Sequence, residues 1–84
     1  NKTFHVVVVD DEPVVRQAIS QSLGAVGCSV RAYPSGDLCL EALRDQHTDL
    51  VISDISMPGM DGVQLLECIR AEFPGTRVIM MSGY

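Results

Sequence analysis

The chain has 84 residues, of which 46% are hydrophobic and 20% charged, a composition typical of one small domain with a single core. Its formal net charge of −5 and its six scattered Lys and Arg residues argue against the clustered basic surface that nucleic-acid binding requires. The apolar runs are far too short to span a bilayer, and the N-terminus lacks the basic-then-apolar pattern of a signal peptide. We therefore expect a cytoplasmic domain without nucleic-acid or membrane contacts of its own.

The cysteines and histidines form no metal-binding or redox pattern. Cys28, Cys39 and Cys68 are widely spaced, and no C-x-x-C pair is present. Each lies within or beside an apolar stretch, so we expect reduced thiols in the core. His5 and His47 have no second histidine or cysteine at a ligand spacing, and we expect ordinary surface or strand-edge side chains.

The first predicted strand and helix flank an acidic turn. Residues 6–9 are a valine run without alternation, typical of a strand buried on both faces in a parallel sheet. Three acidic residues follow, and Pro13 suits the first turn of a helix. The apolar residues at helical spacing are Val15, Ile19 and Leu23. We also expect Val14 in the core, and Gly24 or Gly27 at the end of the helix.

A second strand and helix are predicted over the next twenty residues. Residues 29–33 alternate apolar and polar side chains before a Pro-Ser-Gly turn, as a short strand would. Ser35 is the predicted N-cap of a helix that ends near residues 46–48. The predicted core face of that helix consists of Leu38, Cys39, Ala42 and Leu43.

The third strand again ends in an acid. Residues 50–52 are apolar and lead into Asp54, after which a loop dense in turn residues follows. Asp61 is the predicted N-cap of a third helix, which the Pro-Gly pair at 74–75 ends. Its predicted core face consists of Val63, Leu66, Ile69 and Phe73. Residues 78–81 then form a fourth buried strand.

The resulting order, β-α-β-α-β-α-β with short connections, predicts an α/β fold. Right-handed crossovers place the four strands in an open parallel sheet. In such sheets the active groups gather at the carboxyl ends of the strands, where the strand order reverses. Asp10, Asp11, Asp54 and Ser82 all lie at predicted strand carboxyl ends. We therefore expect these four residues to meet at one edge of the sheet.

Several carboxylates at one site favour a bound cation and phosphoryl chemistry. Because such groups repel one another and all the candidate ligands are oxygens, Mg²⁺ fits better than zinc. A carboxylate can attack phosphorus to give an acyl phosphate, while the ion offsets charge. Asp54 is the favoured nucleophile, whereas Asp10 and Asp11 are adjacent and suited to sharing the ion. Ser82 can donate a hydrogen bond to a phosphoryl oxygen.

Three segments together resemble the motifs of bacterial response-regulator receiver domains. They are V-V-D-D-E-P at 8–13, S-D-I-S-M-P-G-M-D-G at 53–62 and M-S-G at 81–83. The D-x-x-M-P-x-M-D-G pattern is highly specific, whereas the acidic pair alone would be weak. The resemblance covers essentially all 84 residues. It implies a flavodoxin-like doubly wound sheet, with residues 1–84 as the N-terminal part of a single receiver domain that lacks the C-terminal α-β-α.

The resemblance also implies roles for individual residues. Asp54 would be the phosphoacceptor, Asp10 and Asp11 the acidic pocket, and Ser82 the switch hydroxyl. The Mg²⁺ ligands would be Asp11, Asp54 and the backbone carbonyl of Ser56, with Asp10 beside them. The phosphodonor would be a sensor histidine kinase or a small molecule such as acetyl phosphate. The chain would then be a signalling domain that switches an output domain elsewhere in the protein, commonly a transcription regulator, and not an enzyme with an external substrate.

Receivers of this family continue through a fourth helix, a fifth strand with an essential lysine and a fifth helix. Lys2 is the only lysine in these 84 residues. Ending after the fourth strand would leave that strand as a sheet edge with an uncovered apolar face. We therefore expect self-association or an exchange of elements, as in a swapped dimer.

Two other classes of function stay open on the sequence. One is a receiver-like module that only binds proteins or itself, which the missing lysine strand favours and the complete acid set opposes. The other is a carboxylate-nucleophile phosphatase, which the absence of an acid two residues after Asp54 disfavours. Nucleotide binding is not expected, because neither G-x-G-x-x-G nor G-x-x-x-x-G-K-[ST] follows the first strand.

Overall fold

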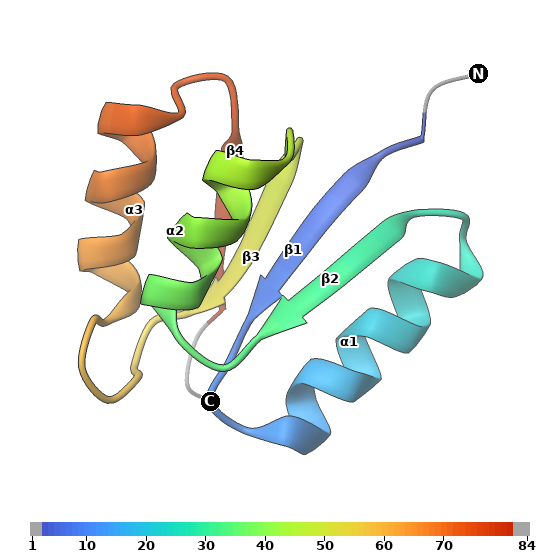
Figure 1. The fold of residues 1–84 in the computed structure, drawn as a ribbon. Helices are drawn as coiled ribbons and strands as arrows, with labels where there is room; N and C mark the ends of the chain where they lie inside the picture. Colours follow the sequence, from blue (N-terminus) through green and yellow to red (C-terminus); the bar gives the residue numbers. More distant parts are fainter. Residues whose placement is uncertain (1–2, 82–84) are drawn as a thin grey trace.

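The computed structural model describes residues 3–81, which form one parallel four-stranded sheet and three helices (Figure 1). In chain order the elements are β1 (His5–Val9), α1 (Pro13–Ala25), β2 (Ser29–Tyr33), α2 (Gly36–Asp45), β3 (Leu50–Asp54), α3 (Gly62–Glu72) and β4 (Arg77–Met81). The strand order is β2-β1-β3-β4. The predicted α/β class, element order and parallel sheet are therefore confirmed.

The central strand β1 is buried on both sides, as its unbroken valine run predicts. Val7 and Val9 belong to the core cluster that includes side chains of α2 and α3. Val6 and Val8 alternate with them and point to the opposite face, where α1 lies against β1 and β2. All four valines are at most 1% exposed. The sheet is thus covered on one face by α2 and α3, which lie side by side, and on the other by α1 (Figure 1).

The helix α1 contributes less to the core than its sequence suggests. Val15, Ile19 and Leu23 are half-buried, and no residue of α1 is fully buried. The prediction that Val14 is a core residue was wrong, because its side chain is 77% exposed. Of the two glycines proposed to end the helix, Gly24 lies within it, whereas Gly27 follows it with φ 95°. The left-handed conformation at Gly27 suits a helix end, since glycine adopts it without steric strain.

The predicted core faces of α2 and α3 were correct in part. Leu38 and Val63 are 42% and 53% exposed, whereas Leu40 and Leu65, which the predicted faces omitted, are 5% and 0% exposed. Residues at the helix starts such as Cys39 and Leu65 are fully buried, so the exposure of Leu38 and Val63 reflects which side of each helix faces the core.

Both predicted N-caps are confirmed. The Ser35 hydroxyl accepts a hydrogen bond from the Leu38 amide at 3.3 Å. The Asp61 carboxylate accepts one from the Gln64 amide at 2.9 Å, and the Gln64 side chain accepts one from the Asp61 amide at 3.0 Å. This reciprocal pair is a capping box, which satisfies two amides that have no partner within the helix. It fixes the start of α3 directly after the loop that follows β3.

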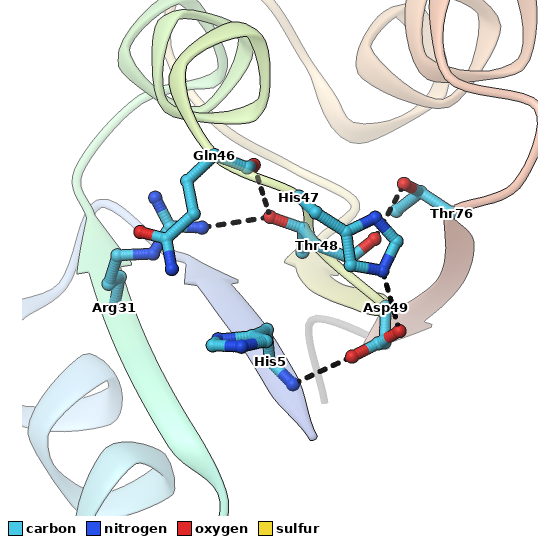
Figure 2. A network of polar contacts seen from close by, with 7 residues as sticks. All are labelled: His5, Arg31, Gln46, His47, Thr48, Asp49 and Thr76. Atoms are coloured by element: carbon cyan, nitrogen blue, oxygen red, sulfur yellow. Dashed lines mark hydrogen bonds and ion pairs between the residues drawn. The ribbon is translucent and has the colours of Figure 1, made fainter. Parts of the chain in front are cut away.

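A polar network joins the amino ends of the strands, opposite the edge where the acidic residues lie (Figure 2). Asp49 accepts hydrogen bonds at 2.8 Å from the His5 amide, and its other oxygen lies 2.8 Å from His47 Nε2. The Thr48 hydroxyl accepts a hydrogen bond from the Arg31 guanidinium at 2.8 Å. The Thr76 hydroxyl donates to the Thr48 carbonyl at 2.8 Å. His5 begins a strand and His47 is exposed, as predicted for surface or strand-edge histidines.

Asp49 makes the stability of this network depend on pH. The His5 amide, and then the His47 ring, hold the pKa of the Asp49 carboxyl below its usual range. A carboxyl with a lowered folded pKa stabilises the fold above its unfolded pKa of about 3.9, and this contribution is lost as the pH falls through the folded pKa. We expect Asp49→Asn to reduce the loss of stability between about pH 5 and about pH 3, measured as the urea midpoint. The control is Asp45→Asn, at an exposed residue. If the urea midpoint fell equally with pH in both variants and in the unaltered chain, Asp49 would not be the source of the acid sensitivity.

Candidate functional site

The carboxyl ends of β1 and β3 bring two of the predicted acidic residues together. Val9 pairs with Ser53 across these neighbouring strands, so Asp10 and Asp54 follow directly from paired positions. Asp11 comes next along the chain. One carboxylate oxygen from each of the three residues lies within 4.8 Å of the others. β1 leads through α1 to β2 on one side, and β3 leads through α3 to β4 on the other. The cluster therefore occupies the point where the strand order reverses.

Asp10 is the buried member of the cluster, with only 3% of its surface exposed. One of its carboxylate oxygens accepts a hydrogen bond from the Glu12 amide at 2.9 Å. Its carbonyl accepts one from the Arg16 guanidinium at 2.8 Å, which holds the first turn of α1 against the site. Burial raises the pKa of the Asp10 carboxyl, the Glu12 amide opposes this, and the Asp54 and Asp11 carboxylates add to it. A cation bound between the three acids would offset this repulsion.

Asp54 is half-buried and lies open enough to react. Its carboxylate accepts a hydrogen bond from the Ser56 amide at 3.2 Å. The backbone on both sides is fixed, because the Ser53 hydroxyl donates to the Asp54 carbonyl at 2.9 Å and the Ile55 amide donates to the Met81 carbonyl at 3.2 Å. The structure thus holds the main chain of Asp54 rigidly and leaves its carboxylate accessible.

Gly62 is a functional candidate that sequence reasoning missed. A Cβ atom at this position would lie 2.4 Å from the Asp54 carbonyl oxygen and 2.9 Å from the Ile55 Cα. The Gly62 amide also donates to the Ile55 carbonyl at 2.9 Å. The start of α3 therefore packs directly on the backbone that carries Asp54, at a distance that only glycine permits. The available signal was the Asp-Gly pair at the end of the specific motif, which the sequence interpretation treated only as a helix start.

The loop between Asp54 and α3 is anchored in the core as well. Met57 is 8% exposed and belongs to the main core cluster, and Met60 packs against that cluster. Met60 also lies against Gly36 at the start of α2, where an added Cβ would lie 2.9 Å from the methionine sulfur. The conformation of this loop is therefore set by contacts with two helices as well as by its turn residues.

Two further residues were predicted at the site. Ser56 is exposed, and its amide contacts the Asp54 carboxylate, while the ligand role of its carbonyl stays a prediction. Ser82, the predicted switch hydroxyl, lies outside the described residues.

The donor set matches a hard divalent cation. All three clustered side chains offer carboxylate oxygens, and within residues 3–81 no histidine or cysteine joins the cluster. Mg²⁺ binds through one or two protein carboxylates, retains several waters and readily accepts phosphate oxygens. The three cysteines are unpaired thiols, and burial raises the pKa of the Cys39 thiol to about 12. The acidic cluster therefore fits Mg²⁺, and Cys39 stays a protonated core side chain.

A parallel sheet in the order β2-β1-β3-β4, with an acidic cluster at its switch point, is a flavodoxin-like α/β fold with a candidate cation site. The model of the response regulator receiver domain family matches residues 6–84. The chain therefore belongs to this family and is a receiver domain of two-component response regulators.

Individual relatives agree with this assignment. The response regulator protein FleR of Pseudomonas aeruginosa is 40% identical over 79 residues, which cover 94% of this chain and 17% of FleR. The DNA-binding transcriptional regulator NtrC of Klebsiella pneumoniae is 38% identical over 77 residues, which cover 92% of this chain and 16% of NtrC. The structure of the response regulator protein TrrA of Thermotoga maritima in complex with Mg²⁺-BeF is similar with a TM-score of 0.92 at 30% identity, covering 98% of this chain and 71% of TrrA.

The chain spans about one sixth of the length of these two curated relatives. None of the helices within residues 3–81 is long and apolar enough to cross a membrane.

Proposed function

We propose that this receiver domain accepts a phosphoryl group on Asp54. The observation that carries the proposal is the convergence of the Asp10, Asp11 and Asp54 carboxylates at the carboxyl ends of β1 and β3, within 4.8 Å of one another. Asp54 is the nucleophile because its carboxylate is the more accessible of the two that end strands, whereas Asp10 is buried. The structure of TrrA, which shares the fold, is a complex with Mg²⁺-BeF, and this supports binding of Mg²⁺ and a phosphate-like anion by a domain of this kind.

The chemical step transfers the phosphoryl group from nitrogen or oxygen to a carboxylate. An Asp54 oxygen attacks the phosphorus of a phosphohistidine, and the new O–P bond forms as the P–N bond breaks. The imidazole nitrogen keeps the electron pair of the broken bond and takes up a proton. Mg²⁺ held by Asp10, Asp11, Asp54 and the Ser56 carbonyl would offset charge on the phosphoryl oxygens. The Ser56 amide and the fixed backbone of Asp54 orient the attacking oxygen, and Ser82 would donate a hydrogen bond to the product.

The partners follow from the family. The donor would be a sensor histidine kinase. A segment similar to this chain also occurs within the sensor histidine kinase RcsC of Escherichia coli, 37% identical over 70 residues that cover 83% of this chain and 7% of RcsC. The output would be a transcription regulator, as the relative NtrC is a DNA-binding transcriptional regulator. The domain itself would act as a cytoplasmic phosphoacceptor and not as an enzyme with an external substrate.

Labelling with acetyl phosphate tests the proposal. The chain, and the protein continued beyond Tyr84 to the length of a solved receiver, are incubated with acetyl phosphate and Mg²⁺, and intact masses are measured. We expect the continued protein to gain the mass of one phosphoryl group per chain, and to lose this labelling when EDTA removes the metal. Labelling of the 84-residue chain as well would show that a fifth-strand lysine is dispensable. Failure of both proteins to label, while both bind Mg²⁺, would favour a protein-binding module.

A second proposal concerns self-association, which the edge of the sheet favours. β4 pairs only with β3 in the described sheet, and Ile79 on it is 52% exposed. Beside it lies a hollow of 480 Å³, where Leu50, Leu66 and Val78 form the apolar part of the lining and Arg70 and Arg77 the charged part. An exposed apolar edge strand is a template for pairing with another chain.

We expect the 84-residue chain to associate as its concentration rises, measured by analytical ultracentrifugation. Ile79→Lys should shift the chain toward the monomer, because a charged edge residue opposes strand pairing. The control is Val26→Lys, at a residue that is 76% exposed at the end of α1. A well-ordered monomer at high concentration would contradict this second proposal.

A further inference from the structure

A groove lies on the side of the molecule that α2 and α3 cover, and it is lined by residues of both helices and of the loop that precedes α3. Its volume is 680 Å³. The two helices run side by side from the end of the molecule where β3 terminates (Figure 1). The side chains that line the groove are Asp37, Met60, Gln64, Glu67, Cys68 and Ala71.

The groove combines apolar and acidic surfaces. Met60 and Cys68 are half-buried and pack against the main core, so they form an apolar floor. Asp37 on α2 and Glu67 on α3 are exposed. The lining contains no Lys, Arg or His, and neither carboxylate takes part in an ion pair among residues 3–81. The site therefore offers negative charge and apolar surface with no cation of its own.

An ion pair between α2 and α3 shows that an acidic side chain on these helices can pair with a cation. The Arg44 guanidinium of α2 lies 2.9 Å from the Glu72 carboxylate of α3, near the C-terminal ends of both helices. Asp37 in the first turn of α2 and Glu67 in the middle of α3 are also exposed, and neither has such a partner among residues 3–81. A cationic group from another molecule could take the place that Arg44 takes for Glu72.

The shape of the lining favours an extended occupant. Gln64, Glu67 or Cys68, and Ala71 follow one another at intervals of three and four residues, so they form one track along α3. Met60 extends this track into the loop that precedes the helix. A metal ion would not fit, because the group of ligand atoms close enough for metal binding in the described part of the chain is the Asp10, Asp11 and Asp54 cluster. Nucleic acids and anionic lipids would be repelled by the two carboxylates.

We propose that the groove between α2 and α3 binds a cationic amphipathic segment of a partner protein. Apolar side chains of the partner would contact Met60, Cys68 and Ala71, while Lys or Arg side chains would pair with Asp37 and Glu67. This is the helix-in-groove type of recognition, with charge complementarity at the rim. Met60 belongs to the loop that joins Asp54 to α3, so the groove and the acidic cluster share one segment. The binding itself does not depend on phosphorylation of Asp54.

Titration of the ¹⁵N-labelled chain with a synthetic peptide tests this proposal. The probe is an amphipathic helical peptide of Leu and Lys, and a peptide with the same Lys residues but Ser in place of Leu is its control. We expect amide shift changes to concentrate on the residues that line the groove, and the Leu-containing peptide to bind more tightly. Equal binding of both peptides, or shift changes centred elsewhere, would overturn the proposal.

Matched variants separate the groove from the overall negative charge. The double variant Asp37→Asn/Glu67→Gln should bind the Leu-Lys peptide about fivefold more weakly. The double variant Glu41→Gln/Asp45→Asn removes the same charge from exposed positions of α2 outside the groove, and should bind nearly as the unaltered chain does. Ala71→Arg places a cation in the groove at an exposed position and should weaken binding by about tenfold. Equal weakening in both double variants would show general attraction to an acidic protein and overturn the proposal.

Discussion

Asp54→Asn is expected to reduce phosphoryl labelling by acetyl phosphate from one group per chain to none. The amide of Asn is not a nucleophile toward phosphorus, so the O–P bond cannot form. The geometry should otherwise persist, because an Asn oxygen can still accept the hydrogen bond that the Ser56 amide donates to Asp54. The measurement is the intact mass of the continued protein after incubation with acetyl phosphate and Mg²⁺.

The stability of the same variant shows whether it has lost chemistry or structure. Asp54 lies in a cluster with two other carboxylates, so removing its charge should relieve repulsion of about 1 kcal/mol or more without metal. We therefore expect Asp54→Asn to unfold at an equal or higher urea concentration when EDTA is present, and to bind Mg²⁺ more weakly. Asp45→Asn, at an exposed acid on α2, should label normally. Labelling of Asp54→Asn equal to that of the unaltered protein would show that another residue is the acceptor.

Gly62→Ala is expected to lower both stability and labelling. The added Cβ would lie 2.4 Å from the Asp54 carbonyl oxygen and 3.2 Å from its carbonyl carbon. These are backbone atoms fixed by the sheet, which cannot move aside as the end of a flexible side chain can. Overpacking of this kind costs about 2 kcal/mol. Because the displaced backbone carries the acceptor, we also expect labelling to slow by about tenfold or more.

Two other glycines serve as controls for this variant. At Gly24, within α1, an added Cβ would have no neighbour within 4 Å, and Gly24→Ala should stabilise the chain by about 1 kcal/mol through helix propensity. At Gly36 the closest atom is the sulfur of the flexible Met60 side chain at 2.9 Å, so Gly36→Ala should cost less than Gly62→Ala. Urea unfolding and the rate of mass gain measure both effects. If Gly62→Ala were as stable and as readily labelled as the unaltered protein, the contact with Asp54 would not constrain the site.

The local structure of this chain could largely be predicted from its sequence. The second strand has the predicted bounds, Ser29–Tyr33, and the first begins one residue before the predicted valine run. Ser35 and Asp61 cap α2 and α3 as expected. These features depend on neighbours within about four residues along the chain, where turn residues, caps and apolar runs act directly on the backbone.

The rotation of the helices about their own axes was harder to predict. Apolar spacing on α3 is compatible with a core face through Val63 and Leu66, yet the structure buries Leu65 and exposes Val63. The choice between adjacent faces depends on how α2 and α3 pack against each other as well as against the sheet. It is a property of the assembled layers, which the periodicity of one segment cannot specify.

The sequence by itself determined the order of the elements and the position of Asp10, Asp11 and Asp54 at strand ends. Parallel topology alone then requires these acids to share one edge of the sheet, because the carboxyl ends of parallel strands coincide. Only the tertiary structure decided which atoms meet there. Three features depend on contacts between different elements of the chain. They are the close approach of Gly62 to the Asp54 backbone, the burial of Asp10, and the acidic groove between α2 and α3. The distances between these segments are set by how whole helices pack on the sheet. Because the core is closely packed, a helix cannot shift along the sheet without leaving a void or a clash.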